Sequence, residues 1–310
     1  MACAATKFVL INKTFNNNYS FNESDETSLE LCDKWILSKL NQVNIKVAAL
    51  LKEYKLGESA KLLYEFTWND FCDWYVEFAK QRFNNKETNN RQISEKVLIK
   101  VLNDILVMIH PFMPHITEEL WHVLQLKSDK ELLSLQKWPT QENKFVDNKL
   151  DDSFQQLFEI IRLIRNLRAE LGLKPSEKVP VYLISDNDEL IDFLKILVDD
   201  IQTLTKSSEV FIFKPNAVDK KEFAKSFSGI ISDLEVYLPF QDFVNMDALK
   251  ERLNKDLKKV TIELDNLNKR LSNKNFVDKA PKDIVDECRF KLNEGSVQME
   301  RITKKLELLN

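Results

Sequence analysis

Glycine and proline are scarce in this chain, whose 310 residues include 4 glycines and 8 prolines. Glycine-rich loops that wrap phosphates and long, turn-rich sheets both depend on these residues, so we expect neither a nucleotide-binding loop nor an all-β fold. The four cysteines are far apart and form no Cys-x-x-Cys pair: Cys3, Cys32, Cys72 and Cys288. A disulfide framework and a zinc site are therefore not expected, and a reducing cytoplasm is the compartment that fits.

Histidine is equally rare. The three histidines, His110, His115 and His122, do not have the spacing of four that places two metal ligands on one helix face. We therefore predict no metal site. No nucleophile is accompanied by a base and an orienting carboxylate, so we predict no catalytic residues either. We find no signal peptide and no apolar run long enough to cross a membrane, and we expect no membrane partner.

The remaining composition is that of an ordinary soluble globular protein. Hydrophobic residues make up 44% of the chain and charged residues 30%, and the length allows two or three domains. The formal net charge is −4, whereas nucleic-acid binders are usually basic. Any surface for RNA must therefore be local rather than spread over the whole chain.

The stretch from Leu249 to Leu309 predicts two long amphipathic helices that fold back on each other. Their apolar residues recur at steps of three and four, the repeat of a coiled-coil seam. They are Leu249, Leu253, Leu257, Val260, Leu264, Leu267 and Leu271 in the first helix, and Val285, Cys288, Leu292, Gly295, Met299, Ile302, Leu306 and Leu309 in the second. Ser272 and Asn273 suit a turn, and Pro281 suits the first turn of the returning helix. On periodicity alone, a dimerisation coiled coil or a solvated spacer fits as well as an arm that binds a partner.

Before this hairpin, the sequence predicts an antiparallel bundle of helices joined by short loops. The expected helices span residues 28–54, 58–83, 89–109, 116–126 and 151–171. We expect Ser28 to cap the first helix, Gly57 to end it and Gly172 to end the last. A short helix at 1–15 and a polar loop at 16–26 are expected to precede the bundle.

Between the bundle and the hairpin, the periodicity changes to that of strands. Residues 178–184, 209–213 and 234–238 predict strands, and residues 188–198 predict a short amphipathic helix. The expected fold class is mainly α, with an antiparallel helical bundle, a small α/β module and a C-terminal two-helix antiparallel coiled-coil hairpin. We place a junction segment at 1–27, the bundle at 28–175, the linking module at 176–243 and the arm at 244–310.

Three segments of the expected bundle are rich in aromatic residues: 33–40, 66–77 and 110–121. Each fits an amphipathic helix with aromatic side chains toward a core and carboxylates at its edge, so packing and capping account for most of these residues. Asp70 and Asp73 share a helix face, but neither a nucleophile nor a base accompanies them. An acid–base pair is therefore not expected.

Taken together, however, these segments resemble a known family. Asp33-Lys34-Trp35-Ile36, Trp68-Asn69-Asp70-Phe71-Cys72-Asp73-Trp74-Tyr75 and His110-Pro111-Phe112-Met113-Pro114 resemble the anticodon-binding bundle of the class I synthetases for valine, isoleucine and leucine, and the second run is most similar to the valyl family. Arg270-Leu271-Ser272-Asn273, Phe276-Val277 and Lys279-Ala280-Pro281 resemble the C-terminal arm of bacterial valyl-tRNA synthetases. Residues 5–12 resemble the segment that leads into the bundle from the catalytic core. The likeness covers almost the whole chain and is weakest at 185–232. It implies that the arm lies against the outer corner of tRNA.

Within that resemblance, basic and aromatic residues are the candidates for contact with RNA. Anticodon bases are read by stacking on aromatic or arginine planes, whereas lysine and arginine hold phosphates. For the anticodon we predict Arg82, Phe83, Arg91 and the basic stripe of Arg162, Arg165 and Arg168. For the tRNA corner we predict Lys258, Lys259, Lys269, Arg270 and Lys274, on a helix at 246–275 with 8 basic and 5 acidic residues. A solvated charged face is the ordinary alternative for each set.

The resemblance implies the tRNA-binding C-terminal part of a valine–tRNA ligase. The expected partners are the tRNA for valine and the missing catalytic and editing domains. The two ATP signatures of the catalytic domain, of the His-x-Gly-His and Lys-Met-Ser-Lys-Ser kind, are absent from the sequence. This chain should therefore not activate valine by itself and should need no cofactor, whereas the full-length enzyme would use ATP and magnesium.

We expect a cytoplasmic monomer. Two alternatives stay open at this point. The first is a free-standing tRNA-binding or assembly factor that acts in trans, and the second is a helical interaction module that dimerises through its coiled coil.

Overall fold

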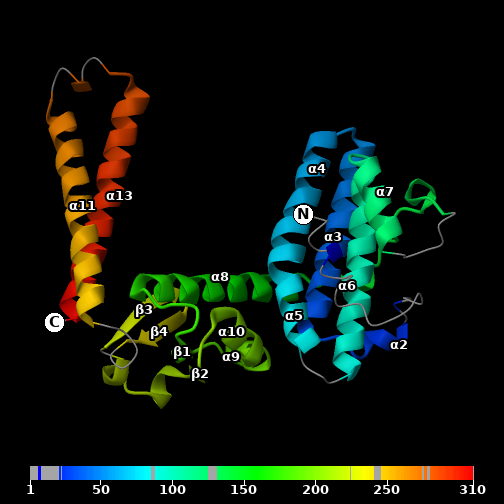
Figure 1. Cartoon of the computed structure of the whole chain (residues 1–310), viewed down its shortest axis with the longest axis horizontal. Helices are drawn as coiled ribbons and strands as arrows, with labels where there is room; N and C mark the ends of the chain where they lie inside the picture. The colour runs from blue at the N-terminus through cyan, green and yellow to red at the C-terminus, as the bar shows by residue number, and fades with distance from the viewer. Residues whose placement is uncertain are drawn as a thin grey trace. The chain divides into compact units, whose positions relative to one another are not determined.

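The computed structural model describes residues 6–7, 21, 23–84, 88–124, 131–223, 225–240, 246–273, 276–277 and 280–309. By its internal contacts the chain divides into two compact units, Met1–Leu157 and Phe158–Asn310 (Figure 1). The expected helical bundle, small sheet and C-terminal hairpin are all present, which confirms the fold class. Among the described residues, no helix is both long and apolar enough to span a bilayer.

The first unit is a bundle whose long helices lie side by side (Figure 1). Its elements are α2 (Glu23–Glu26), α3 (Leu31–Lys52), α4 (Leu56–Glu65), the π-helix η1 (Phe66–Tyr75), α5 (Val76–Asn84), α6 (Thr88–Ile109), α7 (Pro114–Val123), the 3-10 turns η2 (Leu133–Leu135) and η3 (Asn143–Phe145), and the start of α8 (Asn148–Leu171). Aromatic side chains fill the core. Trp35 stacks on Phe154 with ring centroids 5.0 Å apart, and both are fully buried.

The ends of α3 differ from the prediction. Ser28 is not its cap, because Glu30 holds that position and its backbone N–H donates to Asp33 Oδ2 at 3.1 Å. Gly57 does not end the helix either, since it lies inside α4. Tyr54 takes the left-handed conformation instead (φ 59°), and the Lys55 N–H closes back on the Leu50 carbonyl at 2.9 Å. This is the bonding of a Schellman ending, formed here around a tyrosine rather than a glycine.

The expected helix at 58–83 is continuous but not uniform. Its middle third is the π-helix η1, in which the hydrogen bonds span one extra residue. Buried Phe66, Phe71 and Tyr75 are five and then four residues apart, a spacing that suits the wider turn. The same segment carries Asp70, which is half-buried. Burial raises the pKa of Asp70 to about 6, Lys39 opposes this, and Asp151 and Glu65 add to it.

The prediction for the N-terminal segment is only partly within the described residues. Of the helix expected at 1–15, only Thr6 and Lys7 are described, and both are helical. Part of the loop expected at 16–26 is instead the short helix α2. Most of the segment at 5–12 that resembles the entry to the bundle lies outside the described residues.

The second unit joins the end of α8 to a small sheet. Its further elements are β1 (Val181–Ser185), α9 (Asp188–Ile196), α10 (Val198–Thr205), β2 (Val210–Phe213), the 3-10 turns η4 (Pro215–Ala217) and η5 (Lys220–Phe223), β3 (Ser226–Ile231) and β4 (Leu234–Pro239). The strand order is β2-β1-β4-β3, with β1 parallel to β2 and the other pairs antiparallel. The three predicted strands are confirmed. Gly172, with φ 71°, ends α8 as predicted.

Helix α10 and strand β3 were not predicted. Strand β3 contains Gly229, which is a poor strand former but is required here by close packing. A Cβ atom at Gly229 would lie 2.6 Å from Leu163 Cδ1, so α8 packs directly over this strand. The turn into β4 uses Ser232 with φ 51° rather than a glycine or asparagine, so the usual hairpin signal is absent.

The arm consists of α11 (Met246–Ser272) and α13 (Lys282–Leu308), packed against each other as a hairpin. Nine of the predicted seam residues are buried: Leu249, Leu253, Val260, Leu264, Leu267, Val285, Cys288, Ile302 and Leu309. A Cβ atom at Gly295 would lie 2.7 Å from Leu264 Cδ2, which explains a glycine within the seam. Met299 is 36% exposed, so the seam opens locally. Pro281 precedes α13 rather than lying in its first turn.

The raised pKa of Asp70 predicts a pH-dependent cost in stability. The folded-state pKa of Asp70 lies above its unfolded value, so protonation of Asp70 favours the folded state. This contribution to the free energy of unfolding is complete below about pH 4 and is lost as the pH rises through about 6. We expect Asp70→Asn to raise the free energy of unfolding by about 1 to 2 kcal/mol at pH 7.5.

Urea unfolding monitored by tryptophan fluorescence reports on the first unit, because Trp35, Trp68, Trp74, Trp121 and Trp138 all belong to it. The unfolding free energies of the unmodified chain and of Asp70→Asn should become equal near pH 4. If they were already equal at pH 7.5, the prediction would be wrong. Asp73→Asn is the matched control, since this residue is exposed.

Candidate nucleic-acid interface

Arg82 lies at the centre of a buried polar network in the bundle. Its Nη1 donates to both carboxylate oxygens of Asp33, at 2.8 and 2.9 Å, and to Ser94 Oγ at 2.8 Å. The Tyr75 hydroxyl donates to the same carboxylate at 2.8 Å. Nη2 pairs with Glu30 at 2.5 Å. The network therefore connects α3, η1, α5 and α6.

Burial makes this network costly unless its charges stay paired. Asp33 is 0% and Arg82 9% exposed. Burial by itself lowers the pKa of Arg82, but the neighbouring Cys32, Asp33, Tyr75 and Glu30 raise it further than burial lowers it. The guanidinium thus stays charged and is directed into the bundle. The structure places Arg82 among core residues rather than on an open surface.

Phe83 and Arg91 meet where α5 ends and α6 begins. The Arg91 guanidinium carbon lies 5.6 Å from the centroid of the Phe83 ring, within the range of a cation–π contact. Phe83 is 9% exposed and Arg91 is half-buried. The sequence predicted that these residues gather at one end of the bundle, and the structure brings these two into contact. Arg82 precedes Phe83 and connects this end to α3.

The basic stripe of α8 divides into an exposed part and a buried part. Arg162 and Arg165 are exposed, and Arg165 Nε donates to the Leu204 carbonyl at 3.1 Å. Arg168 is 6% exposed, and its Nη2 donates to the Glu177 carbonyl at 2.7 Å. Burial lowers the pKa of Arg168. The sequence predicted one continuous stripe, but the chain that turns back after α8 covers its third residue.

Four of the five predicted arm cations are described, and all four are exposed: Lys258, Lys259, Lys269 and Arg270. Lys274 lies outside the described residues. Lys258 and Lys269 are three helical turns apart on α11, which is about 16 Å, and Lys259 and Arg270 repeat that spacing on an adjacent face. Lys259 and Arg270 also line a shallow groove of about 460 Å³. Helix α11 thus presents two short rows of two exposed cations each, and Lys259 also pairs with Asp256, with 3.5 Å between Nζ and Oδ1.

The buried Asp33–Arg82 pair is the feature that the sequence analysis missed. Each residue lies on a helix face with buried apolar neighbours three and four positions away, which are Ile36 and Leu37 for Asp33 and Ala79 and Phe78 for Arg82. A charge at such a position indicates a buried partner. Residue type alone does not name that partner, since the two residues are 49 positions apart.

Two protein-family models match the chain, one over the helical bundle and one over the arm. Residues 33–183 match the anticodon-binding domain of tRNA ligases. Residues 245–310 match the tRNA binding arm of valyl-tRNA synthetases. The chain belongs to the valyl-tRNA synthetase family. It therefore carries the anticodon-binding and tRNA-binding region of that family, as the resemblance implied.

Relatives in the valyl-tRNA synthetase family match the chain over nearly all its length. It is 73% identical to a valine–tRNA ligase of Prochlorococcus marinus subsp. pastoris over 98% of the chain and 33% of that protein. It is 38% identical to one of Synechocystis sp. over 98% of the chain and 34% of that protein. It is 36% identical to one of Carboxydothermus hydrogenoformans over 99% of the chain and 34% of that protein. The chain thus spans about a third of these relatives.

The environment of Arg82 predicts that this residue stabilises the anticodon-binding bundle. In Arg82→Met the apolar stem is kept and the Asp33 carboxylate is left buried without its main partner. Breaking a buried pair in this way costs about 3 to 5 kcal/mol of unfolding free energy. Urea unfolding followed by tryptophan fluorescence measures the loss.

Lys80→Met is the matched control on the same helix, because Lys80 pairs with Glu77 at the surface, where its side chain is 45% exposed. Its unfolding free energy should change by about 0.5 kcal/mol or less. If Arg82→Met proved as stable as this control, the network would not be structural.

Proposed function

We propose that this chain docks the tRNA for valine within a valine–tRNA ligase. In this proposal the bundle at 28–175 receives the anticodon stem-loop, and the module at 176–243 joins it to the arm. The arm at 244–310 braces the outer corner of the tRNA. The observation that carries the proposal is the presence in one chain of an anticodon-binding match and a valyl arm match.

For the anticodon, the proposal assigns base stacking to the half-buried Arg91, and Phe83, which is 9% exposed, would support the Arg91 guanidinium from behind. An arginine plane against an aromatic ring is a surface on which an unstacked base can lie. Arg82 belongs to this site as the residue that holds Phe83 and the end of α5 in place, since its own guanidinium is bound to Asp33. Exposed Arg162 and Arg165 would hold phosphates of the anticodon stem-loop. Arg168 would support that helix end through the Glu177 carbonyl.

For the tRNA corner, the proposal assigns phosphate contacts to Lys258, Lys259, Lys269, Arg270 and Lys274. The four described members of this set are exposed on one helix, and Lys259 would exchange its pairing with Asp256 for a phosphate. Contacts with phosphates position a nucleic acid but do not read its sequence. Valine-specific recognition would therefore come from the bundle, and the arm would supply affinity.

In the whole enzyme the chain would act by positioning. A catalytic domain outside this chain would attach valine with ATP and magnesium, and an editing domain would hydrolyse wrongly charged tRNA. No cluster suited to a metal occurs among the described residues here. Holding the tRNA in one geometry lowers the entropic cost of the transfer step.

The proposal predicts a division of labour that tRNA binding can measure. We expect the chain to bind valine tRNA more tightly than the same tRNA with a swapped anticodon. Arg91→Met should remove most of this preference. The double variant Lys269→Met, Arg270→Met should weaken the binding of both tRNAs by the same factor. It should also reduce the slope of log affinity against log salt by about 2, because two phosphate contacts are lost. Titrations across a salt series provide all of these quantities.

Lys195→Met is the matched control, because Lys195 is a surface cation of α9 and its side chain is 60% exposed. It should change neither the preference nor the slope. Equal binding of both tRNAs by the unmodified chain would mean that it supplies only phosphate contacts. If neither tRNA bound at low salt, the alternative of a helical interaction module would replace the proposal.

A further inference from the structure

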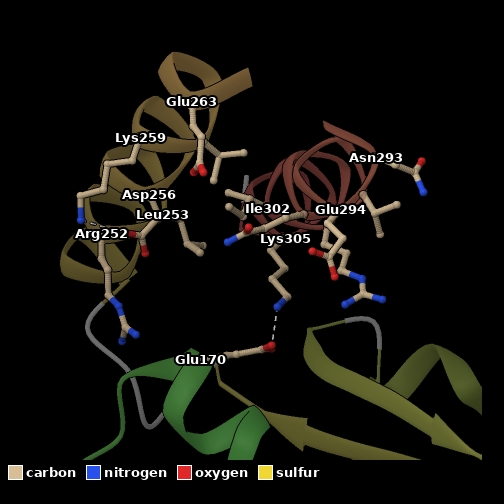
Figure 2. A pocket seen from close by; sticks show the side chains of 14 residues that line it. Glu170, Arg252, Leu253, Asp256, Lys259, Glu263, Asn293, Glu294, Ile302 and Lys305 are labelled. Carbon is tan, nitrogen blue, oxygen red and sulfur yellow. Dashed lines mark hydrogen bonds and ion pairs between the residues drawn. The ribbon is translucent and has the colours of Figure 1, made fainter. Parts of the chain in front are cut away.

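Charged side chains at the base of the arm contact the rest of the second unit. Lys305, near the end of α13, points toward α8 and pairs with Glu170, with 2.5 Å between Nζ and Oε2 (Figure 2). The same Nζ lies 5.4 Å from the centroid of the Phe227 ring on β3. Phe227 in turn packs edge-on against Phe240, which follows β4. Lys305 therefore connects the arm to both the helix and the sheet.

A second contact comes from the other arm helix. Arg252 of α11 donates from Nη1 to the Ala169 carbonyl at 3.2 Å, in the last turn of α8. The same carbonyl also accepts from the Gly172 N–H at 3.0 Å, so Arg252 adds a second donor at a helix end that favours positive charge. Gly172 leaves the space for this side chain, since a Cβ atom there would lie 2.9 Å from Arg252 Nη1. Gly172, which ends α8, thus also leaves room for this contact with the arm.

Among the described residues, a groove with a largely charged lining lies beside these contacts. A groove of about 830 Å³ lies between the bases of α11 and α13 and reaches Glu170 (Figure 2). Its lining is largely charged and includes Asp256, Lys259, Glu263, Glu294 and Arg301. Leu253 and Ile302 contribute apolar surface to its walls. A groove lined by charged side chains does not fix the direction of a helix pair as a packed core does.

We call the Lys305–Glu170 pair the latch, and its strength decides how firmly it can hold the arm. The side chains of Lys305 and Glu170 are 23% and 43% exposed. Such a pair contributes little to folding, and its loss should leave the arm helical. It is still enough to favour one direction of the arm over others by up to about fivefold.

We infer that Lys305 and Arg252 are positioning residues that set the direction of the arm before tRNA arrives. This inference rests on the proposed function, because it explains how the arm is prepared for its partner. An arm that already points in the binding direction loses less freedom on binding, which raises the observed affinity. The residues that set this direction do not themselves need to touch the RNA.

The test is a distance distribution between labels on the sheet module and on the arm. Noncanonical amino acids at the exposed positions 195 and 265 carry spin labels without use of the native cysteines. In Lys305→Met the distribution should broaden, while circular dichroism stays unchanged. The matched control is Lys304→Met, which removes the same charge one residue earlier, where Lys304 pairs only at the surface with Glu300. That variant should keep the narrow distribution.

One further double variant and one salt condition make the result specific. Lys305→Glu combined with Glu170→Lys should narrow the distribution again, because the pair is restored with reversed charge. High salt should broaden the distribution of the unmodified chain but not that of Lys305→Met. If Lys305→Met matches Lys304→Met in width, the latch does not exist and the inference is overturned.

Binding of valine tRNA then separates the inference from the function on which it rests. Lys305→Met should bind about two- to fivefold more weakly than Lys304→Met, with the same preference for the valine anticodon. If neither the unmodified chain nor either variant bound tRNA, the proposed function would be contradicted. The label-to-label distance distributions would still decide whether the latch exists. A broadened distribution with unchanged affinity would overturn the claim that the latch prepares the arm.

Discussion

A buried charge must be matched by a partner, and this constraint organises the bundle. Asp33 lies within α3 with no exposed surface, and Arg82 of α5 is the cation that neutralises it. Because Tyr75 and Ser94 bind the same pair of groups, η1 and α6 are held to the same place. The position of Phe83 follows from this, since it is the next residue along α5. The proposed contact surface for a base would thus depend on an ion pair that is itself almost out of reach of solvent.

Hydrophobic periodicity predicted most of the fold because the helices and strands each bury one face. The arm seam, the bundle and three strands all followed from spacing. The failures have local causes. Tyr54 ends α3 in place of Gly57, because hydrogen bonds from the Schellman turn offset the cost of a left-handed tyrosine. Strand β3 was missed because Gly229 serves the close approach of Leu163, a tertiary requirement that no local pattern reveals.

The candidate site was predictable to the extent that it depends on exposed charge. Lys258, Lys259, Lys269 and Arg270 lie on the surface of α11, where their positions in the heptad place them. Arg168 has the spacing of a surface stripe, yet the turn after Gly172 brings backbone carbonyls over it. The contacts of Lys305 and Arg252 could not be predicted, because they join residues 135 and 83 positions apart. Long-range partners of charged residues are set by the tertiary fold.

The two rows of cations on α11 have a consequence for how this arm can change over evolution. Their spacing is fixed by the hydrogen-bonded helix and not by the side chains between them. Substitutions on the outward face between Lys258 and Lys269 therefore leave the spacing intact. Insertion or deletion of one residue there would turn everything beyond it by about 100° around the helix axis. It would move the second cation of each row out of line with the first and shift the apolar seam out of register with α13. The arm should tolerate wide variation in composition but almost none in length.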